Sequence, residues 1–478
     1  MPRDIIAKAF LSTGADIKDY TYQRGFGNRF SSEAVPDVLP KGRNAPQRVK
    51  YDLYSEQLNG SSFIAPRRDI RHVWMYRIRP SVSHGRVSAS EMNTYIESVF
   101  SSANQNVETV ASQESWDPFP LPSRHTGDGI DFVCGIRTVG GQGDPTLREG
   151  LAVHIYSADS SMNKSAFCNN DGDLLIIPQT GRLDIQTELG WMMVHPGEIA
   201  VIQAGIRFRV LLLMVPLEVF GGHYDLPELG PLGSNGLALP QDFQSPCASF
   251  DLDNSNWRIV YKLAGQLHAC NQNHTPFDVV AWQGNLVPYK YAIEKFVNLA
   301  NVEKDQADPT IYCVLTAKSK IPGVSLTDFL IFTPKWITTS NTFRPPYYHR
   351  NMSTEIMGLI YGEYGGSSHK LEPGGLSYEA SYMPHGETYE TWRRATTREL
   401  APERICEGTA AFMFHVSVPI FLTKWVLEGE GARTRHSHRS QDEQLDSFQS
   451  HFLNHVEEVN LELEAAGLPP LTSSEAKK

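Results

Sequence analysis

Long apolar runs are absent from this chain. No stretch approaches the ~18 consecutive apolar residues that a membrane-spanning helix needs. Residues 1–10 hold no apolar core of the kind found in signal peptides, and residues 474–478 do not form a Ser-Lys-Leu peroxisomal signal. These absences predict a cytoplasmic protein without a membrane partner.

Cysteine is scarce and scattered. Six cysteines occur among 478 residues, and no two of them form a Cys-x-x-Cys pair. Scattered thiols in a chain of this size are typical of a reducing compartment, and we expect them to be mostly buried or idle. The six are Cys134, Cys168, Cys247, Cys270, Cys313 and Cys406.

Positive charge is also in short supply. The chain has 43 Lys and Arg against 54 Asp and Glu, for a net charge of -11. This balance argues against nucleic acid as a partner, because phosphate binding relies on clustered Lys and Arg. With 41% hydrophobic and 20% charged residues, the composition is that of a globular protein, and 478 residues suffice for two or more domains.

Long amphipathic helices are rare as well, and short apolar runs take their place. Such runs occur at residues 174–178, 192–197 and 199–202. Each run ends at a Gly or Pro, or just before a turn. Runs of this length predict strands, and many of them at close spacing favour a sandwich or closed roll of antiparallel sheet. The predicted class is therefore all-β with minor α.

The stretch 172–210 is similar to a cupin jelly roll that has lost its metal ligands. It contains His195 at the end of a predicted strand, with no partner carboxylate recognised at ligand spacing. We expect a solvated turn histidine there. A second roll, over about 282–424, holds three candidate ligands, so metal is expected only in the C-terminal roll.

Those candidates are His349, Glu355 and His385. Two imidazoles and one carboxylate on one face of an octahedral metal leave three positions open, which is the arrangement of non-haem Fe(II) oxygenases. O2 and an organic substrate can then bind the same ion side by side. Spacing alone is weak support, because any long chain offers many such triples.

The sequence around these residues is more specific. The chain closely resembles the homogentisate 1,2-dioxygenase family in residues 343–358 and 381–386. The resemblance extends to further segments from about residue 22 to about 425. The further segments include 25–28, 53–58, 77–84, 170–173, 288–291, 314–319 and 411–414. The resemblance implies Fe(II) held by His349, Glu355 and His385, with O2 and a hydroquinone-type aromatic as substrates. It also implies a homo-oligomer, a hexamer built as a dimer of trimers.

The resemblance assigns four residues to the substrate pocket. Tyr364 falls on a tyrosine that contacts the substrate in the family, and Asn351 on an asparagine of the same pocket. Ser367 stands where the family has a lysine suited to attract a carboxylate, and the ligand His385 lies beside the substrate. A tyrosine hydroxyl and an amide can each donate a hydrogen bond to substrate oxygens.

Two further departures concern the residues that handle protons. The family motif Ala-Trp-His-Gly-Asn reads Ala-Trp-Gln-Gly-Asn at 281–285, and Gln283 has no proton-accepting group near neutral pH. A second pocket histidine is Glu379 here. Glu379 could act as the base, or could select a neutral or cationic substrate. His369 and Lys370 could replace the charge missing at Ser367, so both alternatives stay open.

Two functions remain in view. The first is an Fe(II) dioxygenase that opens a hydroquinone-type ring, either homogentisate, giving maleylacetoacetate in tyrosine catabolism, or a related substituted hydroquinone. The alternative is a catalytically silent paralogue that acts as a binding or regulatory protein. Intact ligands favour the first, and the missing histidine base favours the second.

The expected domains are an N-terminal β domain over 1–280, a catalytic domain over 281–430 and an extension over 431–478. In the extension, apolar residues recur at steps of three and four, which predicts an amphipathic helix. Ser440 can cap its start, and Gly467 its end. We expect it to pack on the body or on a neighbouring subunit. Its apolar residues are Leu445, Phe448, Phe452, Val456, Val459 and Leu463.

Overall fold

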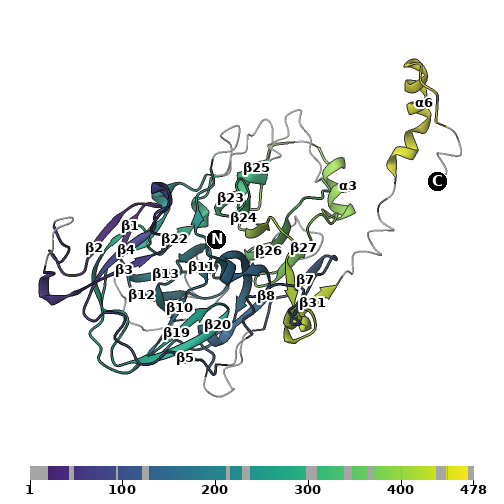
Figure 1. Ribbon diagram of the computed structural model, residues 1–478. Coiled ribbons are helices and arrows are strands. Elements are labelled where there is room, and N and C mark those ends of the chain that lie inside the picture. The colour runs from purple at the N-terminus through teal and green to yellow at the C-terminus, as the bar shows by residue number, and fades with distance from the viewer. Residues whose placement is uncertain are drawn as a thin grey trace.

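The computed structural model of the chain is rich in strands (Figure 1). It describes residues 20–41, 48–92, 95–120, 129–211, 216–228, 237–297, 309–337, 347–363, 371–399, 401–437, 448 and 450–471. The expected all-β class with two cupin-like domains is confirmed, and the strands predicted around residues 174, 192 and 199 are present as β11, β13 and β14.

Two large sheets build the N-terminal domain. The ten-stranded sheet runs β1 (Tyr22–Arg24), β18 (Gln244–Pro246), β22 (Tyr289–Ala292), β14 (Glu198–Ile202), β11 (Gly172–Ile176), β16 (Pro216–Phe220), β9 (Glu149–Tyr156), β8 (Ile136–Asp144), β30 (Phe421–Thr423) and β6 (Val107–Glu108). The seven-stranded sheet runs β13 (Gly190–Val194), β12 (Leu183–Thr187), β15 (Arg207–Leu211), β10 (Ser165–Asn169), β19 (Trp257–Leu263), β20 (Gln266–Gln272) and β5 (Ser88–Ala89).

A third large sheet builds the C-terminal domain. Its order is β17 (Tyr224–Asp225), β23 (Cys313–Lys318), β24 (Ser325–Phe332), β29 (Ala410–Val416), β26 (Thr354–Tyr361), β27 (Leu376–Glu379), β7 (Glu114–Trp116) and β31 (Arg435–Ser437). A smaller sheet holds β2 (Phe30–Glu33), β21 (Val279–Gly284), β4 (His72–Arg77) and β3 (Tyr54–Asn59), and β25 (Lys335–Ile337) pairs with β28 (Glu403–Ile405).

The α-helices in the described part of the chain are short, namely α2 (Phe132–Gly135), α3 (Tyr389–Thr397), α4 (Lys424–Leu427) and α6 (Val456–Ala465). Within the described residues, no helix is both long and apolar enough to span a membrane.

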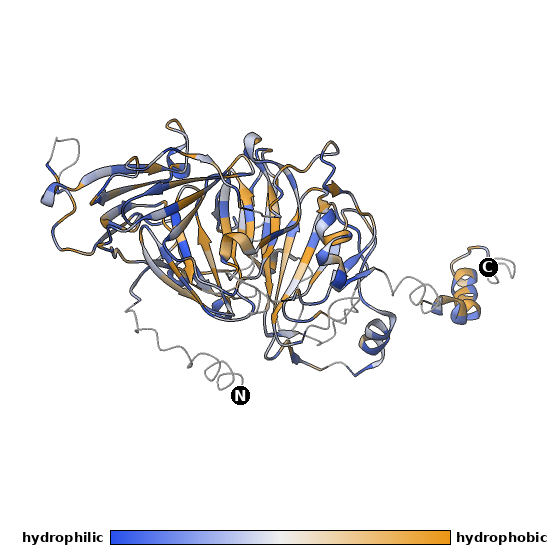
Figure 2. Cartoon of the chain, turned by 90° about the horizontal axis from the view of Figure 1, so that it is seen from below, coloured by the Kyte–Doolittle hydropathy of each residue, from blue (hydrophilic) through white to orange (hydrophobic). Residues whose placement is uncertain are grey.

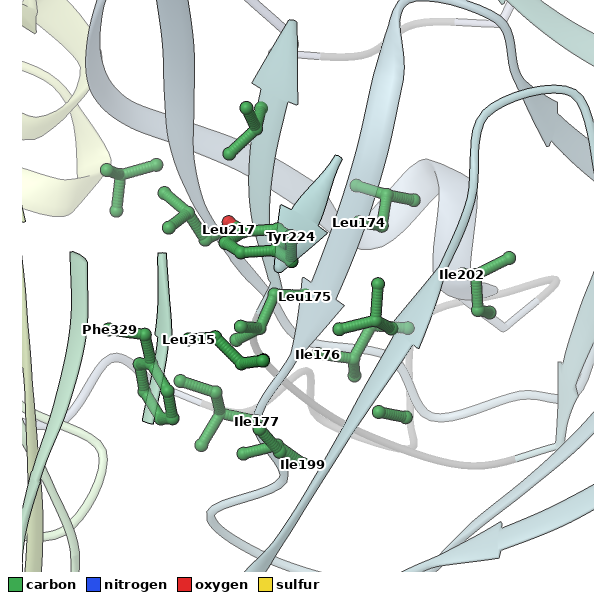
Figure 3. Packing of buried hydrophobic residues seen from close by; sticks show 14 of the residues in the cluster. Leu174, Leu175, Ile176, Ile177, Ile199, Ile202, Leu217, Tyr224, Leu315 and Phe329 are labelled. Atoms are coloured by element: carbon green, nitrogen blue, oxygen red, sulfur yellow. The ribbon is translucent and has the colours of Figure 1, made fainter. Parts of the chain in front are cut away.

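One hydrophobic core joins the two domains. Leu175 and Ile177 from the N-terminal domain meet Leu315 and Phe329 from the C-terminal sheet (Figure 3). All five residues of β11 are buried, which fits a strand covered on both faces and explains its apolar run Leu174–Ile176. Apolar strands are orange through the middle of Figure 2. The division into 1–280, 281–430 and 431–478 stays a prediction, and β21 and β22 pair with N-terminal strands.

His195 follows β13 as expected, with 40% of its side chain exposed. It does have a carboxylate neighbour that the sequence analysis did not name. Glu198 Oε2 lies 3.6 Å from His195 Nε2, because the turn at 195–198 brings the start of β14 back beside the end of β13. One carboxylate and one half-exposed imidazole make a local ion pair in a turn.

The C-terminal helix ends where the sequence predicts. Gly467 has a φ of +72°, and the amide of Leu468 donates to the carbonyl of Leu463 at 2.8 Å. The amide of Gly467 donates to Glu464, which completes a Schellman motif. The predicted cap at Ser440 and Leu445 lie outside the described residues.

The start of this helix differs from the prediction. The α-helix begins only at Val456, after the 3-10 turn η8 (His451–His455), so Phe448 and Phe452 do not share its face. Instead Phe448 packs edge-on to Tyr389 of α3, and the His451 ring stacks on Tyr389 and Trp392. Aromatic contacts with α3 place this segment, while α6 lies at the periphery of the molecule in Figures 1 and 2.

Candidate metal centre

His349 and His385 come together through their backbones. The two residues form an isolated antiparallel bridge, in which each amide donates to the other carbonyl, at N–O distances of 3.0 and 3.1 Å. Glu355 lies beside them as the second residue of β26, and only 7% of it is exposed. The backbone bridge therefore fixes His349 and His385, and the buried strand β26 fixes Glu355. The three residues lie within 36 positions of one another in the sequence.

The three side chains converge. Glu355 Oε1 lies 3.6 Å from His349 Nε2, and Glu355 Oε2 lies 3.4 Å from His385 Nε2. One ligand atom from each residue falls within 4.8 Å of the others. Neighbouring ligands of an octahedral ion with bonds of ~2.1 Å lie ~3 Å apart, so small side-chain shifts would bring all three onto one ion.

The state of the donor atoms also fits a metal ion. His385 Nδ1 faces the carbonyl of Met383 at 2.9 Å, so Nδ1 carries the proton and Nε2 is left as a lone-pair donor. His385 Nε2 faces Glu355 Oε2 at 3.4 Å, and His349 Nε2 faces Glu355 Oε1 at 3.6 Å. One imidazole nitrogen of each histidine is thus directed at the carboxylate, and imidazole and carboxylate are both suitable iron ligands.

The electrostatics of the site also favour a bound cation. Burial by itself raises the pKa of Glu355, but hydrogen bonds from His349, His385 and Asn351 outweigh it and hold the pKa well below its usual range. Burial lowers the pKa of His385, but its hydrogen bond to Glu355 prevails and raises that pKa to about 9. Glu355 thus attracts positive charge, which a proton supplies when no metal is bound.

Asn351 supports the carboxylate directly. Its Nδ2 donates to Glu355 Oε1 at 2.7 Å, and its Oδ1 accepts from the amide of Ser353 at 2.9 Å. The second bond fixes the orientation of the amide group. Asn351, predicted as a substrate-pocket residue, therefore adjoins the site and holds a proposed ligand.

Glu379 is a close neighbour of the same carboxylate. It lies on β27 directly opposite Glu355, is 8% exposed and accepts a hydrogen bond from the side-chain amide of Gln113. Burial raises the pKa of Glu379 to about 8, against the opposing effect of His385. Gln113 could not be predicted from the sequence, because it directly precedes β7 and reaches Glu379 only through the pairing of β7 with β27.

Gln283, another predicted site residue, does not lie at the metal centre. Gln283 lies on β21, where its amide donates to the Tyr76 hydroxyl at 3.2 Å. β21 pairs with β2 and β4, at the left of Figure 1, whereas β26 and β27 lie right of its centre. Tyr364 and Ser367, together with His369 and Lys370, lie outside the described residues.

Comparisons with known proteins give relatives over nearly the whole chain. The family profile described as homogentisate 1,2-dioxygenase N-terminal matches residues 21–293, and the corresponding C-terminal profile matches 294–452. The homogentisate 1,2-dioxygenase of Drosophila melanogaster is 45% identical over 416 residues, which cover 86% of this chain and 94% of that protein. The Homo sapiens protein of the same name is 43% identical over 439 residues, covering 90% and 96%.

A solved structure gives only a distant likeness. The cupin 2 conserved barrel domain protein from Leptotrichia buccalis is 9% identical, covers 62% of this chain and 92% of its own, and has a TM-score of 0.25. The profiles together span 21–452, and the two relatives are covered almost completely. The chain therefore belongs to the homogentisate 1,2-dioxygenase family, a family of ring-cleaving dioxygenases.

Proposed function

We propose that the chain is an Fe(II)-dependent dioxygenase that opens the ring of homogentisate or of a related hydroquinone. The observation that carries this proposal is the convergence of His349, Glu355 and His385 within 4.8 Å, in a chain about 45% identical to proteins named homogentisate 1,2-dioxygenase. An iron ion bound there would give O2 and a phenolic oxygen neighbouring sites.

The chain's own residues prepare that site. Asn351 orients the Glu355 carboxylate, and the Met383 carbonyl fixes which nitrogen of His385 faces the ion. Burial excludes water from Glu355 and Glu379. Electrostatic interactions between these two residues and a charged substrate are therefore stronger than they would be in water. Glu379 is proposed to exchange a proton with a substrate hydroxyl through its carboxyl oxygen, the role for which Gln283 has no suitable group.

A role for Gln283 at the metal centre requires another copy of the chain. We propose that the protein assembles as a hexamer, a dimer of trimers, and that the β2–β21–β4–β3 sheet of one subunit approaches the metal centre of the next. The separation of β21 from β26 within one chain supports this arrangement. The cytoplasmic location expected from the sequence stays a prediction that cell fractionation would test.

Iron content and oxygen uptake test the proposal together. Protein prepared anaerobically with Fe(II) should bind about one ion per chain and consume O2 with at least one compound from a panel of hydroquinones. His385→Ala should lose both properties, because two protein ligands seldom hold Fe(II) in water. His195→Ala, in the N-terminal roll, is the matched control and should lose neither.

Two outcomes would contradict the proposal. A full iron complement in His385→Ala would show that the ligand assignment is wrong. Iron binding by the wild-type chain without oxygen uptake on any hydroquinone would favour the silent paralogue, for which the missing base at Gln283 is the supporting observation.

A further inference from the structure

A row of polar side chains crosses five neighbouring strands of the C-terminal sheet. Glu355 lies opposite Glu379 on one side and opposite His415 on the other. His415 also lies opposite Asp328, and Asp328 opposite Thr316. Directly opposite residues point to the same face with Cβ atoms ~4.5–5.5 Å apart. The proposed metal carboxylate thus belongs to a continuous row of polar groups.

This row faces away from the core that joins the two domains. Side chains one position along each strand all lie in that core, and they are Tyr378, Ile356, Phe414, Phe329 and Leu315. Met357 and Met413, two positions from Glu355 and His415, belong instead to a separate small cluster. Since alternate residues of a strand point to opposite faces, the polar row and this small cluster share one face.

Hydrogen bonds fix the orientation of Asp328 within the row. Its Oδ1 accepts from the Thr316 hydroxyl at 2.6 Å, and its Oδ2 accepts from the Ser325 hydroxyl at 2.8 Å. His415 Nδ1 lies 3.9 Å from the same Oδ2. At that distance the two groups are neighbours without a hydrogen bond, and a small rotation of the imidazole would bring Nδ1 within hydrogen-bond reach of the carboxylate.

His415 lies among acidic residues in the row. Three of the five residues are carboxylic acids, namely Glu379, Glu355 and Asp328, and His415 is the one nitrogen donor among them. It stands between Glu355 and Asp328. An imidazole nitrogen that carries a proton can donate a hydrogen bond to a carboxylate on either neighbouring strand.

His415 is also open to a groove. This groove, of about 630 Å³, is lined by His415, Asp328 and Thr316 together with Leu330 and Cys313. His415 keeps 26% of its side-chain area exposed there, whereas Glu355 is 9% exposed. The imidazole is therefore in contact with the groove rather than enclosed by the core.

We propose that His415, which lies between Asp328 and Glu355 in the row, is a positioning residue for the Glu355 carboxylate of the metal centre. It steadies Glu355 from the β29 side, while Asn351 holds the same carboxylate from the loop before β26. This inference rests on the proposed metal site and goes beyond it, since neither His415 nor Asp328 is one of the three ligands. Residues that support a metal ligand in this way typically affect metal affinity ~10–100-fold.

Metal titration of the full-length apoprotein with Co(II), followed by its visible absorption, tests the proposal without turnover. His415→Leu should weaken Co(II) binding by ~10–100-fold and shift the absorption bands, while His415→Gln, which keeps a donor, should recover part of the affinity. Asp328→Asn should weaken binding less. In the His415→Leu background it should have no further effect, because Asp328 acts through His415.

A second histidine–aspartate pair in the same sheet provides the control. His436 Nε2 on β31 lies 2.6 Å from Asp117 Oδ2, and His436→Leu should leave the Co(II) affinity and spectrum unchanged. Wild-type affinity and spectrum in His415→Leu, or a full additional loss in the double variant, would overturn the inference. If His415→Leu does not fold, His415→Gln and Asp328→Asn decide the question in the same titration. Absence of Co(II) binding by the wild type would instead refute the proposed metal site.

Discussion

Two carboxylates on adjacent strands, Glu355 and Glu379, lie directly opposite each other yet differ in charge. Three hydrogen-bond donors hold the pKa of Glu355 far below its usual range, whereas burial raises the pKa of Glu379 to about 8. Pairs of acids whose pKa values are pushed apart in this way mark acid–base sites, because one member serves as an anion and the other carries the proton. Glu355 is suited to a cation, and Glu379 to a hydrogen bond with the substrate.

The residues that depart from the family pattern predict a change in substrate handling. Gln283→His restores a group that takes a proton near neutral pH, a role worth about 10² to 10⁴ in rate. Ser367→Lys restores a cation that can face the carboxylate of homogentisate and should act mainly on KM. Steady-state oxygen uptake with homogentisate measures both effects.

A hydroquinone without the acetate group is the control substrate, on which Ser367→Lys should have little effect. If the wild type already turns over homogentisate as fast as the double variant, the departures at 283, 367 and 379 are silent. The enzyme is then an ordinary homogentisate dioxygenase.

A partly buried histidine outside the metal centre, His223, predicts pH-dependent stability. Burial lowers the pKa of His223, but Asp173, 2.9 Å from Nδ1, prevails and raises the pKa to about 9. The raised pKa adds stability that is fully present below about 6.5 and is lost as the pH rises through 9, roughly 1–3 kcal/mol in all. Denaturant unfolding between pH 6 and pH 10 should show this loss, and His223→Asn should remove it. An unchanged pH profile in the variant would refute the assignment.

At the scale of elements, β26 links the metal centre to the shared core. Glu355 and Met357 point to one face, and Ile356 to the other. Gly358 lies opposite Phe412, and a Cβ added at Gly358 would come within 2.2 Å of the Phe412 ring. The absence of a side chain there lets the strand pack against that ring.

Gly358→Ala should therefore disturb both stability and metal binding. Overpacking of a close-packed core typically costs about 1–3 kcal/mol, and the shift of β26 should move Glu355 with it. Chemical denaturation and Co(II) titration measure the two effects. Gly222→Ala is the matched control, because the nearest side-chain atom to its added Cβ is 3.6 Å away. Equal stability of the two variants would contradict this account of β26.

Strand register decided which site residues the sequence could predict. His349, Glu355 and His385 could be identified because their motif is local and their chemistry is distinctive. His415 could not, since its place beside Glu355 follows from the pairing of β26 with β29 across 60 residues. The helix start at Ser440 was predicted from apolar spacing alone, whereas aromatic contacts with α3 control the course of residues 448 and 451.

At the scale of the whole molecule, β21 and β26 of one chain lie apart. If Gln283 acts at the metal centre, the complete site therefore requires that subunits assemble. Subunits carrying His385→Ala keep Gln283 but have no metal centre of their own. Subunits carrying Gln283→Ala keep the metal centre but not the glutamine. If one subunit supplies Gln283 to the next, co-expression of the two variants should give mixed hexamers more active than either parent.

Oxygen uptake by particles purified through two different affinity tags measures this complementation, and light scattering gives their mass. Each parent variant alone is the control, as is a mixture assembled from wild-type and His385→Ala subunits. Wild-type activity in Gln283→Ala would place the glutamine outside the site. A monomeric wild-type particle with full oxygen uptake would refute the shared site, because β21 of a single chain does not pair with any strand of the sheet that carries Glu355.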